Sequence, residues 1–426
     1  MKNTIAIVLA AGRGTRMKSD TPKVLHEILG KPMISYVTGA VSKAAVKNIV
    51  VVTGFGSDKV RDFFYGAGIK TVVQKKLLGS ADAVGAAKRE IGRSGDVLVV
   101  YGDTPLITAE TLKKLIEKHK DSCASLTLLT AVLRDPAEYG RIIRDTAGRI
   151  IKIAEDSEAR EYKKETDEIN VGTCVFKSAD LLDSLKGIGC DNSKREYYLT
   201  DTVGILSAGG KRVESIAMED LNEMIGVNSR VELAAATNVM KKRIMEELMA
   251  SGVTIQDPAT TTIYPDVKIG KDTIIYPNTI IESDVKIGEN CRIGPFARLR
   301  GGTRIGNGTE IGNFVELVRT TIADSTKVKH HTYLGDAKVG KNVNIGAGAI
   351  TANYDGKNKS RTFIGDSSFI GVGAIIIAPV KIGKKALVGA GAVILRGTNV
   401  KDGATVVGVP AKVLRRRSGD RRKTDR

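Results

Sequence analysis

An aliphatic residue recurs at every sixth position through much of the second half of the chain. The repeat runs without a gap over residues 263–317, resumes over 322–334 and returns over 364–394. A unit of this length holds one short strand and one turn, and stacked units of this kind form a solenoid. Because the aliphatic side chains of successive coils would stack along the axis, the repeat predicts a parallel β-helix.

The first half of the chain has a different pattern, in which short apolar strands alternate with helical segments. The predicted strands are 4–9, 49–53, 71–74, 97–101 and 125–132. Such alternation is typical of a Rossmann-like α/β domain with a mostly parallel sheet. Ligands of these sheets bind beyond the carboxyl ends of the strands, so the residues after Leu9, Gln74 and Tyr101 are expected to share one cleft.

The segment between the two patterns contains neither Gly nor Pro and predicts a connecting helix. We therefore expect an α/β domain over residues 1–229, a linker helix over 230–250, a β-helix over 251–414 and a basic tail over 415–426. The tail has no apolar periodicity, and a block of like charges is expected to stay solvated and disordered rather than to serve as a nucleic-acid arm.

The composition excludes several classes of protein. Hydrophobic residues make up 42% and charged residues 27% of the 426, as in soluble globular proteins. No stretch reaches the roughly 20 apolar residues of a membrane span, so we expect a cytoplasmic protein without a membrane partner. The four scattered cysteines form neither a disulfide nor a zinc pattern. The net charge of +18 favours anionic partners, but the aromatic content of 4% argues against nucleic acid.

The first predicted strand leads directly into a glycine-rich turn. The string LAAGRGTRM occupies residues 9–17 and is followed by Pro22 and Lys23. Its glycines allow backbone N–H groups to approach phosphate oxygens, while Arg16 and Lys23 supply positive charge for a triphosphate. The spacing is that of neither a Walker loop nor a dinucleotide fingerprint. For a lone G-x-G, a tight turn with surface basic residues would be the better interpretation.

The whole string resembles the signature of sugar-1-phosphate nucleotidyltransferases, L-x-x-G-x-G-T-R-M followed by P-K. The resemblance implies in-line attack of a sugar phosphate on the α-phosphorus of UTP, with release of pyrophosphate and no covalent nucleophile. It makes Arg16 and Lys23 the catalytic residues. It implies nucleotide and UDP-sugar contacts at Leu9, Ala10, Ala11, Gly12, Lys23, Gln74, Gly79, Ser80, Tyr101, Gly102, Asp103, Gly140, Glu155, Asn170 and Asn228.

A carboxylate directly after a predicted strand is a candidate ligand for a hard cation. Asp103 is such a residue, and with the amide oxygen of Asn228 it would fit Mg²⁺, which takes few protein oxygens besides those of phosphates. Helix capping is the ordinary alternative for a single Asp in a loop. The surrounding match to the nucleotidyltransferases favours the metal.

Two adjacent histidines, His330 and His331, lie where the six-residue phase breaks. On a strand they would face opposite sides, so at most one is expected to serve a given site. A histidine can accept a proton from an amine near neutral pH. An ordinary surface pair is the alternative that composition alone would favour.

The hexapeptides resemble the left-handed β-helix of hexapeptide-repeat acyltransferases. From residue 3 to about 413, the chain resembles the bifunctional family of N-acetylglucosamine-1-phosphate uridylyltransferases / glucosamine-1-phosphate acetyltransferases. The left hand and a homotrimer with sites between subunits come from this resemblance alone. It implies that acetyl-CoA acetylates glucosamine 1-phosphate and that UTP then uridylylates N-acetylglucosamine 1-phosphate.

The same resemblance implies roles for residues of the β-helix. His330 would be the general base, with Glu316 orienting it. Contacts with the amino-sugar phosphate would come from Arg300, Tyr333, Asn344 and Lys359. Contacts with acetyl-CoA would come from Ala347, Asn353, Tyr354 and Ala390.

Three positions depart from the family pattern. Val318, Val372 and Gly408 stand where the family commonly has Lys, Ser and Arg. Arg319 could take the place of the missing Lys by reaching round from the next position. An alternative therefore stays open, in which only the nucleotidyltransferase is active and the β-helix is an assembly or regulatory platform. Acetyl-CoA consumption would distinguish the two.

Overall fold

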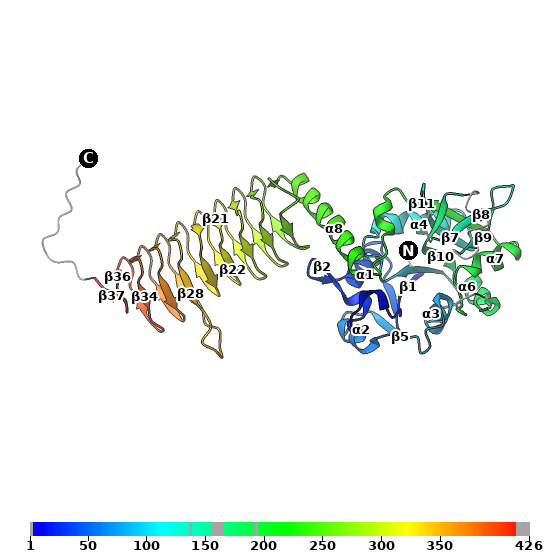
Figure 1. Cartoon of the computed structure of the whole chain (residues 1–426), viewed down its shortest axis with the longest axis horizontal. Coiled ribbons are helices and arrows are strands. Elements are labelled where there is room, and N and C mark those ends of the chain that lie inside the picture. Colours follow the sequence, from blue (N-terminus) through cyan, green and yellow to red (C-terminus); the bar gives the residue numbers. More distant parts are fainter. Residues whose placement is uncertain (1–2, 136–138, 156–165, 191, 193–194, 415–426) are drawn as a thin grey trace. The chain divides into compact units, whose positions relative to one another are not determined.

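The computed structural model describes residues 3–135, 139–155, 166–190, 192 and 195–414. The chain divides into two compact units, Met1–Val239 and Met240–Arg426 (Figure 1). Each unit has its own hydrophobic core, as expected for a chain too long for a single one.

The first unit is built around a sheet whose central strands are parallel. β1 (Thr4–Ala10) lies between β4 (Asn48–Thr53) and β6 (Asp96–Tyr101) and is parallel to both. The other strands are β5 (Lys70–Val73), β7 (Leu126–Val132), β8 (Arg141–Arg144), β9 (Ile150–Ala154), β10 (Glu168–Lys177) and β11 (Val213–Ala217). The main path through the sheet is β11-β7-β10-β6-β1-β4-β5.

Helices cover both faces of this sheet. One face carries α1 (Met33–Lys43), α2 (Ser57–Phe63) and α4 (Ala109–Asp121). The other carries α3 (Ser80–Ala86), α6 (Ser178–Ser184) and α7 (Asp201–Ala208). Successive residues of β1 point alternately into the two cores, which explains why the strand is apolar along its whole length.

Two strands, β9 and β10, run against the other strands of the mostly parallel sheet that the sequence predicts. β10 is inserted between β6 and β7 and is antiparallel to both. Its pairing with β7 shifts between Asn170 and Cys174, where Gly172 has a φ of 92°. A bulge of this kind bends a strand and redirects its side chains, and such bulges are common beside binding sites.

The second unit confirms the predicted parallel β-helix. Its short strands form three sheets of parallel strands, from β12 (Thr254–Ile255) to β36 (Thr405–Val407), with an antiparallel β37 (Lys412–Val413) at the end. Ile263, Ile281 and Leu299 pair in register in successive coils, and each is 0% exposed. The aliphatic repeat therefore fills the axis of the solenoid.

The corners of the solenoid carry a second signal of the same period. Left-handed φ values between 56° and 66° recur at Asp266, Asp272, Asn278, Asp284 and Asn290. Asn and Asp tolerate this conformation better than most side chains do. His331 occupies such a corner with a φ of 45°, whereas His330 ends β24 (Lys327–His330). The two histidines therefore do not share a strand.

A single long helix, α8 (Arg230–Ala250), leads from the first unit into the second. Its Ile244, Met245 and Leu248 pack against the core of the β-helix. Within the described ranges, no helix is long and apolar enough to cross a membrane.

Candidate functional site

The carboxyl ends of β1 and β6 and the residue after β5 meet at one cleft of about 380 Å³. Ten of the predicted contact residues line it: Leu9, Ala10, Ala11, Gly12, Lys23, Gln74, Gly79, Ser80, Tyr101 and Asp103. These residues are far apart in the chain and come together because the parallel strands end on the same side of the sheet.

The glycine-rich turn shapes one wall of the cleft. A Cβ at Gly12 would meet nothing within 4 Å, so its backbone is open to a ligand. Gly14 has a φ of 60°, and a Cβ there would lie 2.7 Å from Cβ of Lys23. The second glycine therefore lets the turn close onto the stem of Lys23 and directs that side chain toward the cleft.

At this cleft, the Lys23 ammonium binds two side-chain oxygens from distant parts of the chain. Its Nζ donates to Asp103 Oδ2 and, at 2.8 Å, to Asn228 Oδ1. The side chains of Lys23 and Asp103 are only 12% and 17% exposed. The backbone N–H of Val227 donates to the carbonyl of Asp103 at 2.8 Å, and that of Asn228 donates to Glu232 at 2.7 Å. A carboxylate and an amide oxygen thus converge on one position that already attracts a cation.

Gln74 and Tyr101 line the same cleft with their polar ends restrained. The amide nitrogen of the buried Gln74 donates to the Gly79 carbonyl at 3.1 Å and to Asp82 at 2.8 Å. Burial raises the pKa of Tyr101 far above its usual value, so its hydroxyl stays protonated and can donate. Ser80 is held as well, since its Oγ accepts from the Leu199 N–H at 2.9 Å.

Gly140, Glu155 and Asn170 come together near Tyr101, on which the charge of Glu155 acts, although they do not line the cleft itself. The Asn170 N–H donates to the Gly140 carbonyl at 2.9 Å. A Cβ on Gly140 would lie 3.6 Å from Oε2 of Glu155, whose Oε1 accepts from Thr200. The structure thus brings the three predicted sugar contacts into one group.

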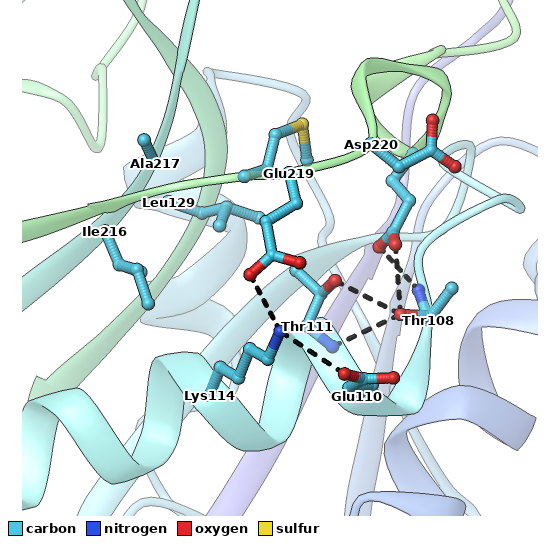
Figure 2. Close-up of a pocket in the computed structure, with 11 residues that line it drawn as sticks. Thr108, Glu110, Thr111, Lys114, Leu129, Ile216, Ala217, Glu219 and Asp220 are labelled. Atoms are coloured by element: carbon cyan, nitrogen blue, oxygen red, sulfur yellow. Dashed lines mark hydrogen bonds and ion pairs between the residues drawn. The ribbon is translucent and has the colours of Figure 1, made fainter.

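Another hollow in the first unit lies between α4 and the segment after β11 (Figure 2). There the buried Glu223 accepts from the Thr108 N–H at 2.9 Å and from its hydroxyl at 3.1 Å. Thr108 in turn caps α4, because its hydroxyl accepts from the Thr111 N–H at 3.2 Å. Lys114 pairs with Glu219 at 2.8 Å and with Glu110 at 3.3 Å. These acidic groups stabilise the helix, and none of the predicted site residues lines this hollow.

In the β-helix, predicted residues stack in a column along one corner. Backbone hydrogen bonds between successive coils join His331 N to Asn313 O, Gly348 N to His330 O, and Gly373 N to Ala347 O. A further bond joins Gly391 N to Val372 O. The residues at equivalent places in successive coils are Asn313, His330, Ala347, Val372 and Ala390. The proposed base and two proposed acetyl-CoA contacts therefore lie on one line.

Among the described residues, no hydrogen bond or ion pair joins His330 to Glu316, the residue expected to orient it. His330 Nδ1 lies 2.8 Å from Asn313 Oδ1 instead. Glu316 accepts from Arg300 Nη1 at 3.1 Å, on the adjacent sheet. His331 is turned to another partner, since its ring stacks on Phe314 with centroids 4.9 Å apart.

The loop after β28 (Ile350–Ala352) is anchored to the same region. Asn353, which is 7% exposed, donates to Asp336 Oδ2 at 2.5 Å and accepts from the Tyr333 hydroxyl at 3.4 Å. Arg319 binds Asp336 through two hydrogen bonds of 2.7 Å and thereby lowers the pKa of that carboxyl. Arg319 follows Val318, the position at which the family commonly has Lys, and it thus organises this loop.

Comparison with known proteins finds a matching family for each half of the chain. Residues 6–169 match the MobA-like NTP transferase domain, and residues 284–319 and 361–396 match the bacterial transferase hexapeptide (six repeats). A protein from Exiguobacterium sp. is 43% identical over 413 residues, covering 89% of this chain and 91% of the relative. Its name is bifunctional protein GlmU. The chain belongs to the GlmU family.

Two further GlmU proteins match over a similar length. That of Listeria monocytogenes serotype 4a is 41% identical, covering 90% of this chain and 92% of its own. That of Pelotomaculum thermopropionicum is 44% identical, covering 88% and 90%. Membership confirms the Rossmann-like nucleotidyltransferase domain followed by a left-handed β-helix. It also confirms the predicted bifunctional transferase of UDP-N-acetylglucosamine synthesis, with uridylyl and acetyl transfer, and it agrees with the use of a divalent metal.

Three residues that the GlmU resemblance did not single out also lie in or beside these sites. Arg13 and Arg16 are both exposed, but only Arg13 lines the cleft, and the charge of Arg16 acts on Glu232. Arg13 stands between the two glycines, which is a signal that the sequence offered. Glu196 also lines the cleft, but nothing in its neighbourhood in the chain predicts that. Asn313, which forms a hydrogen bond with His330, is the third residue that the resemblance did not single out.

The remaining predicted residues lie around these centres. Gly102 packs under the turn, with its N–H on the Leu9 carbonyl at 2.9 Å. Asn344 lies between Lys327 and Phe369 on the sheet that contains β24. Tyr354 pairs with Lys359 across the anchored loop.

Proposed function

We propose that residues 1–229 carry out uridylyl transfer, that 230–250 form the connecting helix and that 251–414 carry out acetyl transfer. The observation that carries the proposal is the cluster of Lys23, Asp103 and Asn228 beside a cleft with an open glycine backbone. In the cleft, Lys23 and the backbone at Gly12 bind the phosphates of UTP, and the exposed Arg16 reaches them from outside the residues that line the cleft. Gln74 Oε1 accepts from the N3–H of uracil, because its amide nitrogen is already held.

The uridylyl step needs positioning more than covalent chemistry. Gly140, Glu155 and Asn170 hold the hydroxyl groups of N-acetylglucosamine 1-phosphate beside Tyr101, with the phosphate facing the α-phosphorus. Attack forms one P–O bond as the bond to pyrophosphate breaks. The Lys23 ammonium offsets charge that develops on the phosphate oxygens, an effect worth about 10²–10³ in rate for a well-placed donor.

Asp103 and Asn228 are the proposed ligands of Mg²⁺. Their oxygens fit a hard cation, and Lys23 holds them at one point as a cation would. When bound, Mg²⁺ would supply charge neutralisation at the phosphates.

His330 is the proposed base of acetyl transfer from acetyl-CoA to glucosamine 1-phosphate. It takes a proton from the amine as nitrogen attacks the thioester carbonyl, and it returns that proton to the departing CoA thiolate. Ala347 and Ala390 offer small side chains along the same column for the pantetheine arm, with Asn353 and Tyr354 beside it. Arg300, Tyr333, Asn344 and Lys359 bind the sugar phosphate, and Glu316 orients this set through Arg300.

A homotrimer is proposed on the basis of the exposed apolar side chains of the later coils. Exposed fractions of 38–58% are found at Phe369, Val372, Ile375, Leu387 and Leu395. An apolar surface of this kind favours association. His330 is exposed in the single chain, so a second copy would be needed to enclose it.

The test follows two signals in one protein. Acetyl-CoA-dependent thiol release with glucosamine 1-phosphate and pyrophosphate release from UTP with N-acetylglucosamine 1-phosphate are measured for the intact chain and for His330→Ala. We expect thiol release to fall by about 100-fold or more in the variant while pyrophosphate release is unchanged. Pyrophosphate release without any thiol release from the intact chain would instead make the β-helix a platform.

A further inference from the structure

A general base works only if the nitrogen that receives the proton carries a free lone pair. Neutral imidazole has one N–H and one lone pair, and the hydrogen bond at the first nitrogen decides which tautomer is present. The partner of His330 Nδ1 is therefore part of the acetyl-transfer site. In this chain that partner is Asn313, at 2.8 Å.

The backbone holds Asn313 and His330 next to each other. Asn313 ends β21 (Glu310–Asn313), His330 ends β24, and the two residues are paired in register in adjacent coils. The His331 N–H donates to the Asn313 carbonyl at 3.0 Å, and the Thr332 hydroxyl donates to the His330 carbonyl at 2.7 Å. The main chain on both sides of the imidazole is thus fixed.

Gly312 permits this close approach. A Cβ at Gly312 would lie 1.9 Å from the carbonyl oxygen of Lys329, which is backbone and cannot move aside. The residue before Asn313 thus has to be glycine for the two strand ends to pack as they do. The coils thus pack closely at the point where the His330 imidazole forms its hydrogen bond with Asn313.

We propose that Asn313 is a positioning residue for acetyl transfer. Its amide oxygen accepts the Nδ1–H of His330, which leaves the Nε2 lone pair to take the proton from the amine. An amide oxygen fixes the tautomer without adding a negative charge beside the base. Glu316 is engaged with Arg300, so it does not compete for Nδ1. This inference rests on the proposed role of His330. It adds the residue that holds the imidazole in the tautomer able to accept the proton.

Three variants of the full-length protein separate this role from a purely structural one. Asn313→Leu keeps the shape but removes the acceptor, and Asn313→Asp keeps an oxygen acceptor but adds charge. Asn307→Leu is the matched control, because Asn307 Oδ1 also bonds across coils, to the Glu289 N–H at 2.9 Å, away from the column. Pyrophosphate release from UTP reports whether each protein is folded.

For Asn313→Leu we expect kcat for thiol release to fall by about 10- to 100-fold, with KM for glucosamine 1-phosphate changed less than about two-fold. Asn313→Asp should recover most of that activity, with the acid limb of its pH profile moved to higher pH because a carboxylate favours the imidazolium. Asn307→Leu should leave thiol release unchanged. Equal losses in both Asn313 variants, or no loss in Asn313→Leu, would overturn the proposal.

A second readout does not depend on activity. The chain has four histidines, so ¹⁵N-histidine NMR with a His330→Gln reference can assign the ring nitrogens of His330. We expect the Nδ1–H tautomer in the intact protein and a mixture in Asn313→Leu. An Nε2–H tautomer in the intact protein would refute the role of Asn313 even if acetyl transfer is active. Absence of thiol release from the intact protein, with the Nδ1–H tautomer present, would refute only the proposed reaction.

Discussion

The two active regions of this chain are assembled over very different distances in the sequence. In the β-helix, His330 and its partner Asn313 are 17 residues apart, which is one coil. In the α/β unit, Lys23 and Asn228 are 205 residues apart and meet only when the sheet has formed. A repeat thus specifies its own contacts, whereas an α/β cleft depends on the topology of the whole domain.

The sharpest test of the repeat compares two neighbours in one strand, β16 (Ile280–Ile281). Ile281 is 0% exposed in the axis, whereas Ile280 is 40% exposed on the outer face. We expect Ile281→Ala to destabilise the β-helix by about 2–5 kcal/mol, because it leaves a cavity in a packed stack. Ile280→Ala should change stability by less than about 0.5 kcal/mol. Chemical denaturation of both proteins measures the difference, and equal losses would break the link between period and axis.

The α/β cleft is tested by removing the charge that links its distant parts. Lys23→Met should lower kcat for pyrophosphate release by about 100-fold, since a well-placed donor to the phosphates is lost. Thiol release from acetyl-CoA should stay within about two-fold of the parent, because the β-helix supplies its own groups. Steady-state assays of both reactions on the same preparation decide this. A comparable fall in both activities would mean that the two regions are coupled.

The difference between the two regions also explains which of their features could be predicted from the sequence. The period alone identified the solenoid, its axis and the place of His330 beside the break in phase. Asn313 could have been found in the same way, because it precedes His330 by one coil, which the slip between Leu317 and Ile322 shortens to 17 residues. The antiparallel insertion of β10 could not, because its apolar residues look the same in either strand direction. Glu196 depends on the path of a segment with no periodic pattern, so only the folded domain brings it to the cleft.

The smallest effect is expected in the pH dependence of stability. It is tested by comparing a buried histidine of the α/β unit with an exposed one of the β-helix. His26 is 7% exposed, and burial, aided by the charge of Arg230, lowers its pKa below the usual 6.5. Arg230 Nη1 lies 3.2 Å from its Nδ1, so protonation would break this contact. The folded state thus binds fewer protons than the unfolded chain just below pH 6.5.

His26 therefore contributes stability that is fully present above its unfolded pKa and is lost as the pH falls from there through the lowered folded value. We expect His26→Gln to weaken the acid-side loss of stability, measured by urea denaturation from about pH 5 to about pH 8. His331→Gln, at an exposed corner of the β-helix, should keep the dependence of the parent. If His26→Gln and the parent follow the same curve, the buried imidazole of His26 does not link proton binding to folding.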